Sequence, residues 1–195
     1  MKQITLNVAL YEELSKEAQS VVIDKYLALK WFDLSHHETS EYNNSLNVFN
    51  SIFGVYGHIE SVGDEAKLIL VQCINHAAKL QAKANPYYAD SFEEKYGSDI
   101  EKFEDAVAVC KNCLLTGVCV DFYLLEPIIE FLEGKQHQSL TFKQLIALCR
   151  SHGRKELAKA IRYFQTRKHV HERLLAMCED YFFEDGTQVP EGLMA

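Results

Sequence analysis

The sequence predicts an α+β fold that is predominantly helical, with a small antiparallel sheet formed by an N-terminal strand and a C-terminal hairpin. Three observations support this fold class. Apolar residues recur at helical spacing through most of the 195 residues. The opening stretch "QITLNVALY" is strand-like, and Asp185-Gly186 near the other end is a favoured two-residue hairpin turn between apolar flanks. Only three prolines and nine glycines occur, which disfavours an all-β chain.

The first third of the chain is expected to contain two strands and two helices. Residues 3–11 form the first strand, because apolar and polar residues alternate in it. A helix at about 16–30 follows, with Ser15 as its N-cap. A second helix ends near Gly54, since glycine is a natural helix stop. Residues 55–63 are then expected to form a short second strand.

The middle of the chain is expected to contain two helices separated by a loop. Asp64 caps the first helix, whose predicted apolar face holds Leu68, Val71, Cys73, Ile74, Ala78 and Leu80. This helix fades before a proline, so residues 86–97 are expected to form a loop. Ser98 then caps a helix that runs to about residue 114.

The last third is expected to be helical up to the terminal hairpin. Pro127 either starts or kinks a short helix that Gly134 closes. Thr141 caps the next helix, which Gly153 is expected to interrupt. A final long helix follows at about 154–181.

Length and composition indicate one domain, residues 1–195, with a possible helical insertion at about 55–110. The first residues do not resemble a signal peptide, and no apolar run approaches the roughly 18 residues that span a bilayer. We therefore expect a cytoplasmic protein with no membrane partner. The formal net charge of −8 disfavours nucleic-acid binding by the whole surface.

Three passages together resemble an uncharacterised family of small phage and prophage accessory proteins. They are "YEELSKEAQ" (11–19), "LTGVCVDFYLLEPIIEFLEG" (115–134) and "CEDYFFEDGTQV" (178–189). Residues 55–110 have no counterpart in that pattern. The resemblance implies a protein of a mobile element, acting in the cytoplasm of the infected bacterial host, and it implies no particular chemistry.

The cysteines and histidines indicate interior packing or solvated side chains better than they indicate a metal site. Cys110, Cys113 and Cys119 offer three thiols, but structural zinc takes four ligands, commonly as two close pairs, and no second pair has that spacing. We interpret this cysteine-rich stretch as the packed edge of a core. His36-His37 and His169-x-His171 are expected to face solvent.

No pattern for catalysis is evident in the sequence. Neighbouring carboxylates on a helix diverge, and the chain contains neither a glycine-rich phosphate loop nor a GxSxG nucleophile elbow. The prediction is a protein that is not an enzyme, with no cofactor, no bound metal and no catalytic residues.

Two charged segments are the candidate functional surfaces. The first supplies carboxylates and aromatic anchors for a basic partner protein, by analogy with phage proteins that block host defence. Its residues are Asp90, Glu93, Glu94, Asp99, Glu101, Glu104 and Asp105, with Tyr87, Tyr88 and Phe92. The second segment is basic and could contact phosphates. Its residues are Arg150, Arg154, Lys155, Lys159, Arg162, Arg167 and Lys168.

Two functions follow from these segments. The first is an anti-CRISPR or anti-restriction inhibitor that occupies a host defence nuclease or effector through the acidic residues. The alternative is a nucleic-acid-binding regulator that uses the basic helix at 150–173. A third arrangement pairs the two charged segments with each other, inside the fold or across a dimer, and the sequence leaves open whether the protein is a monomer or a homodimer.

Overall fold

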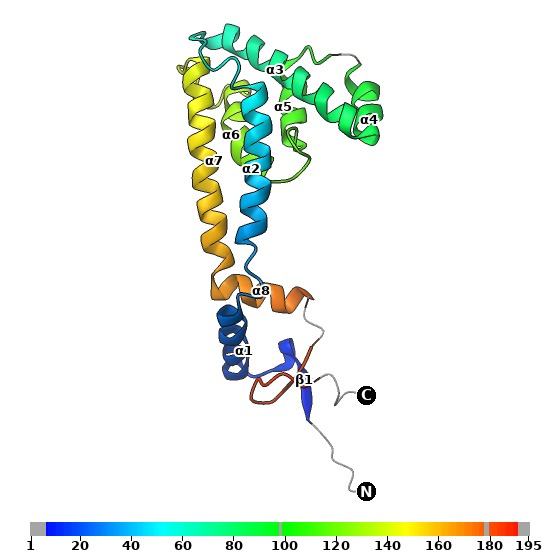
Figure 1. Cartoon of the computed structure of the whole chain (residues 1–195), viewed down its shortest axis with the longest axis vertical. Coiled ribbons are helices and arrows are strands. Elements are labelled where there is room, and N and C mark those ends of the chain that lie inside the picture. The colour runs from blue at the N-terminus through cyan, green and yellow to red at the C-terminus, as the bar shows by residue number, and fades with distance from the viewer. Residues whose placement is uncertain (1–6, 98, 178–179, 191–195) are drawn as a thin grey trace, which may run out of the picture. The chain divides into compact units, whose positions relative to one another are not determined.

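The computed structural model describes residues 7–97, 99–177 and 180–190 (Figure 1). The chain divides into two compact units. The terminal unit comprises residues 1–36 and 159–195, and the central unit comprises residues 37–158. The single domain predicted above stays a prediction, because two compact units can belong to one domain or to two.

The described elements confirm a mostly helical α+β fold with one small antiparallel sheet. In chain order they are β1 (Val8–Leu10), η1 (Tyr11–Glu13), α1 (Lys16–Leu29), α2 (Ser35–Ile52), α3 (Gly63–Ala84), α4 (Pro86–Tyr96), α5 (Phe103–Lys111), α6 (Asp121–Leu132), α7 (Phe142–Phe164), α8 (Arg167–Met177) and β2 (Tyr181–Phe183). In the described part of the chain, none of these helices has the length and apolar character needed to cross a membrane.

The sheet of the terminal unit joins the two ends of the described chain, as predicted. Strands β1 and β2 are antiparallel, with Ala9 opposite Phe182. The predicted hairpin is present, but its loop has the three residues 184–186 and not the two that were predicted. The Phe183 amide donates to the Thr187 carbonyl at 2.8 Å, and the Gly186 amide donates to the Phe183 carbonyl at 2.9 Å. Gly186 has φ +86°, and a Cβ there would lie 2.7 Å from the Ala18 carbonyl oxygen, so the turn requires glycine. Residues 3–6 of the predicted first strand lie outside the described residues.

Helix α1 of the terminal unit is as predicted, and it packs on α8. Its first turn is capped by the Ser15 hydroxyl, which accepts from the Ala18 amide at 3.2 Å. The core of the unit is formed by Tyr11, Leu14, Ala18, Val22, Ile23, Tyr26, Val170, Leu174 and Phe182. Segments from both ends of the sequence therefore share one apolar cluster.

The larger core lies in the central unit, where α3 packs on α4 and α5, and α5 packs on α6 (Figure 1). Its largest fully buried side chains include Phe49, Phe53, Phe131 and Phe142. Pro127 lies inside α6 and not at its start. Its missing N–H leaves the Tyr123 carbonyl without its usual helical donor, and His152 Nδ1 of α7 donates to that oxygen at 3.0 Å.

The strand predicted at 55–63 is wrong. Residues 53–58 form turns, with hydrogen bonds from Gly57 to Gly54 and from Ile59 to Tyr56. The carbonyls of Ile59 and Ser61 then accept from the first amides of α7, those of Lys143 and Phe142, at 3.0 and 2.8 Å. The segment therefore caps the start of α7, a helix distant in sequence, and does not join a sheet. The alternation of apolar and polar residues in 55–63 gives no sign of this role.

The start and the apolar face of α3 also differ from the prediction. The helix begins at Gly63 after Val62, so Asp64 lies in the first turn and does not cap it. Leu68 and Leu80 are 57% and 40% exposed, while Ala66 and Leu70 are among the residues that face the core. The buried face of α3 includes small residues, which permit close packing against α4 and α5. The prediction used apolarity alone and therefore assigned the wrong residues to the buried face.

The loop predicted at 86–97 is wrong, since these residues form α4. Proline needs no amide donor in the first turn, so Pro86 begins the helix, and the Asn85 carbonyl accepts from the Ala89 amide at 3.1 Å. Ser98 lies outside the described residues, but the next helix begins only at Phe103, after Lys102. Helix α3 ends at Ala84, before the proline, as predicted, and the same proline begins the next helix.

Gly153 does not interrupt α7. A Cβ at this position would lie 2.8 Å from Leu124 Cδ2 and 3.0 Å from Tyr42 Cε2, so the glycine allows close contact between elements. The predicted last helix instead divides after Phe164. Thr166 starts α8, because its hydroxyl accepts from the His169 amide at 3.1 Å. The predicted cap at Thr141 is confirmed by reciprocal bonds with Gln144, at 3.0 and 3.2 Å.

Candidate functional site

The predicted acidic residues lie on α4, on the connection after it and on the start of α5, all in the central unit. We call this set the acidic surface: Asp90, Glu93, Glu94, Asp99, Glu101, Glu104 and Asp105. All of them except Asp105, which is half-buried, have exposed side chains. Their spacing along two short helices makes a dense region of negative charge that is open to solvent.

Helix α3 holds the connection between α4 and α5 in place. Asn75 of α3 brackets the backbone of Ile100, accepting from its amide at 2.7 Å and donating to its carbonyl at 3.0 Å. Lys79 of α3 forms an ion pair with Asp99 at 2.7 Å. The Ile100 side chain is 3% exposed. The carboxylates of this connection are therefore presented from a fixed backbone.

Phe92, one of the three predicted aromatic contact residues, instead holds α4 in the fold, which corrects its predicted role. Phe92 is 8% exposed and packs between Tyr88 and Tyr96, with ring centroids at 5.9 and 5.2 Å. It cannot be an interface anchor without moving α4. Tyr88 is half-buried, and burial raises its pKa to about 12. The side chain of Tyr87 lies outside what the structure describes.

A shallow depression of about 300 Å³ lies within the acidic surface. Asp99, Glu101 and Asp105 line it together with Lys95, Tyr96, Ile100 and Lys102. The Lys95 ammonium lies over the Tyr96 ring, 5.0 Å from its centroid. Three carboxylates and two ammonium groups line the depression, so the formal charge of its lining is negative.

The predicted basic residues do not all present their charges to solvent in the same way. Arg150 is half-buried and donates to Asn50 Oδ1 at 2.9 Å. Arg167 pairs with Asp24 and donates to Ser20 Oγ at 2.7 Å, and Lys168 lies 3.8 Å from Glu172. These partners lie outside 90–105, and the pairing of the two charged segments with each other stays a prediction. The remaining four, Arg154, Lys155, Lys159 and Arg162, are exposed on α7.

The cysteines divide between core and surface. Cys110 is 1% exposed, and burial raises its pKa to about 12, which confirms its predicted core position. Cys119 is exposed, and here the prediction of a packed position is wrong. Cys113 is half-buried with φ +54°, and its thiol lies within hydrogen-bonding reach of Cys119. Burial is the largest of the effects that raise the pKa of Cys113. The nearby Cys119 and Asp121 raise it further. Cys178 lies outside the described residues.

Among the described residues, no group of three or more His, Cys, Asp or Glu side chains could hold a metal ion. His36 and His37 are exposed, as predicted. His169 was predicted to face solvent and is instead 5% exposed. Its Nε2–H donates to the Phe32 carbonyl at 3.1 Å, and its ring packs against Tyr163 and Phe164. It connects the start of α8 to the turn after α1.

A fully buried carboxylate, Asp121 at the start of α6, organises the loop that precedes it. Its oxygens accept from the amides of Leu115, Thr116 and Gly117, at 2.8, 2.8 and 3.2 Å. The hydroxyls of Ser45 and Thr116 also donate to it, at 2.6 and 2.8 Å. Sequence analysis missed this role, although a clue was available: the "LTGVCVD" stretch of the phage-like pattern contains the acceptor and every donor except Ser45. This site is structural, because its donors are all used within the chain.

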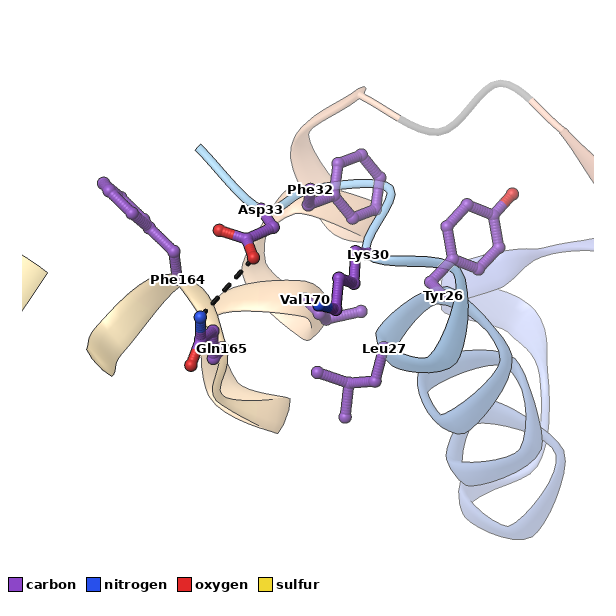
Figure 2. Close-up of a pocket in the computed structure, with 8 residues that line it drawn as sticks. All are labelled: Tyr26, Leu27, Lys30, Phe32, Asp33, Phe164, Gln165 and Val170. Carbon is purple, nitrogen blue, oxygen red and sulfur yellow. Dashed lines mark hydrogen bonds between the residues drawn. The ribbon is translucent and has the colours of Figure 1, made fainter. Parts of the chain in front are cut away.

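An aromatic pocket in the terminal unit was also missed. It has a volume of about 230 Å³ and is lined by Tyr26, Leu27, Lys30, Phe32, Asp33, Phe164, Gln165 and Val170 (Figure 2). These residues come from the end of α1, the turn that follows it, the end of α7 and the start of α8. Because the lining comes from segments more than a hundred residues apart, no local motif could have shown the pocket.

Comparisons of the chain with protein-family models, with curated proteins and with solved structures found no match.

Proposed function

We propose that this protein is a non-catalytic inhibitor that binds a basic surface of a host defence nuclease or effector through the acidic surface. The observation that carries the proposal is the exposure of six carboxylates on α4, α5 and their connection, with the connection held by Asn75 and Lys79. A nuclease holds nucleic acid with Lys and Arg side chains. A rigid array of carboxylates competes with phosphates for those same side chains.

The phage-like sequence pattern supports the choice of partner. A protein of a mobile element acts in the cytoplasm of its bacterial host, and a defence nuclease is a partner there whose basic groove suits an acidic ligand. Charge complementarity chiefly increases the association rate, because the opposite field steers the two proteins together before contact. The core position of Phe92 removes one predicted anchor, so the proposal rests on the charges.

The test compares two variants with equal net charge. In the first, Glu93, Glu94, Glu101 and Glu104 are changed to Gln. In the matched control, four exposed acids outside the acidic surface are changed in the same way: Glu12, Glu17, Glu65 and Glu184. The wild-type chain is used to capture its partner from host lysate, and association rates are then measured with the purified pair at low and high salt.

The first variant should associate at least about tenfold more slowly than the control at low salt, and the difference should shrink at high salt as the charges are screened. Equal association rates for the two variants would exclude the acidic surface as the contact.

The nucleic-acid-binding regulator is the alternative function, favoured by the exposure of Arg154, Lys155, Lys159 and Arg162 on one helix. Such a regulator would bind duplex DNA or RNA with an affinity that falls steeply as the salt concentration rises. The slope of log affinity against log salt concentration becomes shallower as phosphate contacts are removed. Gel-shift titrations of the wild-type chain and of a variant with these four residues changed to Gln measure that slope. Absence of retardation at low salt would exclude this alternative.

A further inference from the structure

The turn after α1 carries an exposed tryptophan directly beside the aromatic pocket. Trp31 is the only tryptophan in the sequence, and it is 70% exposed. Its neighbours in sequence, Lys30, Phe32 and Asp33, all line the pocket (Figure 2). A large aromatic side chain open to water is unfavourable in a protein that stays alone, and tryptophan is enriched among the residues that dominate interfaces.

The backbone holds this turn in a defined shape. Lys30 has φ +52° at the end of α1, a left-handed conformation that usually requires glycine. The amides of Lys30 and Trp31 donate to the carbonyls of Leu27 and Tyr26, at 3.1 and 3.2 Å. The bond from His169 to the Phe32 carbonyl fixes the other side. The exposure of Trp31 therefore belongs to an ordered turn.

The pocket has the size and the lining of a site for a single ring. Its volume of about 230 Å³ is below the roughly 300–1,000 Å³ of sites that enclose drug-sized ligands. Tyr26 and Phe32 stack with ring centroids 5.4 Å apart, and Leu27, Phe164 and Val170 complete the apolar wall. Lys30, Asp33 and Gln165 add polar groups to this wall (Figure 2).

We propose that two copies of the chain associate through the 30–33 turn, with Trp31 of each copy inserted into the aromatic pocket of the other. A twofold interface requires that a residue and its partner exchange roles between the copies. The turn meets that condition because it carries both the protruding side chain and the pocket.

The charges of the turn are also complementary to themselves. When two copies of the turn pack antiparallel, Lys30 of one copy lies opposite Asp33 of the second copy, and the reverse pair forms at the same time. Leu29 and Leu34, which are 59% and 38% exposed, add apolar area at the edge of the contact. This dimer is independent of the acidic surface, which lies in the central unit.

The test uses the full chain and its single tryptophan as the reporter. Sedimentation velocity from about 1 μM to about 1 mM, a range that covers weak dimers, should show a concentration-dependent dimer. Over the same range the Trp31 emission should shift to shorter wavelength, and quenching by acrylamide should decrease. A monomer throughout, with Trp31 open to acrylamide at the highest concentration, would overturn the proposal and leave the face to a different partner.

Three variants locate the contact. Trp31→Ala removes the inserted side chain, and Lys30→Glu places like charges opposite each other, so each should weaken the dimer at least about tenfold. Val21→Ala is the matched control, since it truncates another apolar side chain of the terminal unit that is 55% exposed. Circular dichroism confirms that each variant is folded. Dimerisation of Trp31→Ala with wild-type affinity would contradict insertion of the tryptophan.

Discussion

Asp121 and the acidic surface contain the same chemical group in opposite environments. The Asp121 carboxylate is fully buried and accepts five hydrogen bonds from three amides and two hydroxyls. The carboxylates of the acidic surface are mostly exposed, and among the described residues only Asp99 has an ion pair shorter than 4 Å. A buried charge must be satisfied inside the chain, so Asp121 has nothing to offer a partner.

The comparison shows that burial, and not the number of carboxylates, identifies a carboxylate that is used within the fold. The acidic segment attracts notice in the sequence because its residues are clustered, whereas Asp121 stands alone in an apolar stretch. Asp33 is an intermediate case, half-buried at the edge of the aromatic pocket. Four predictions test this ordering, from the most buried group to the most exposed.

Replacing Asp121 with Ala should have the largest effect. The substitution leaves the amides of residues 115–117 and two hydroxyls without their acceptor in the interior, and loss of one member of a buried charged network costs about 3–5 kcal/mol. The free energy of unfolding, measured in urea on the full chain, should fall by that amount. Glu93→Ala serves as the exposed control. A loss below about 1 kcal/mol for Asp121→Ala would show that water replaces the donors without penalty.

Replacing Thr116 with Val should have the next largest effect. The hydroxyl donates to Asp121 Oδ1 at 2.8 Å and lies 3.1 Å from Ser45 Oγ. Valine has a similar shape, so the change removes one hydrogen bond to a charged group, which contributes about 1.5–3 kcal/mol. Urea unfolding checks the value, and Thr116→Ser should retain most of the stability. Equal losses for the two variants would assign the effect to packing.

Replacing Asp33 with Ala should destabilise the protein by about 1 kcal/mol, because its carboxylate caps the start of α2 by accepting from the Ser35 amide at 2.9 Å. Two hydrogen bonds from Ser35 hold the pKa of Asp33 below its ordinary 3.8. The bond from the Ser35 side chain has the larger effect, and the bond from its amide follows. A depressed pKa stabilises the fold above 3.8, and this contribution is lost as the pH falls through the lower folded value. The difference between wild type and variant should therefore shrink below pH 3.8. An Asp33 pKa at or above 3.8 by NMR titration would contradict the cap.

The four Glu→Gln substitutions in the acidic surface should have the smallest effect on stability. Exposed substitutions away from caps and networks usually change the free energy of unfolding by less than about 0.5 kcal/mol. The same variant should lose association rate with its basic partner, as described above. A stability loss of several kcal/mol in urea would mean that these carboxylates stabilise the fold and would undermine their assignment to binding.

Local signals in the sequence were reliable where the chemistry is local. The caps at Ser15 and Thr141, and the hairpin at Asp185-Gly186, each involve atoms within a few residues of one another. The structure contains all three, with a hairpin loop of three residues in place of the predicted two. The same reasoning failed for 55–63, whose carbonyls bond to amides about 80 residues away. It failed for Gly153 because the atoms that exclude a side chain belong to Leu124 and Tyr42.

The sequence by itself determined the α+β class, the helical caps at Ser15 and Thr141, the hairpin that joins the chain ends and the residues of the acidic surface. These depend on periodicity, turn chemistry and charge, which act over short distances along the chain. Only the tertiary structure decided that Phe92 and His169 are buried, that Asp121 is enclosed, and that the turn at Trp31 lies beside a pocket. Burial and pocket shape arise when segments distant in sequence pack against each other. The free energy of such contacts depends on both segments, so it cannot be predicted from either one alone.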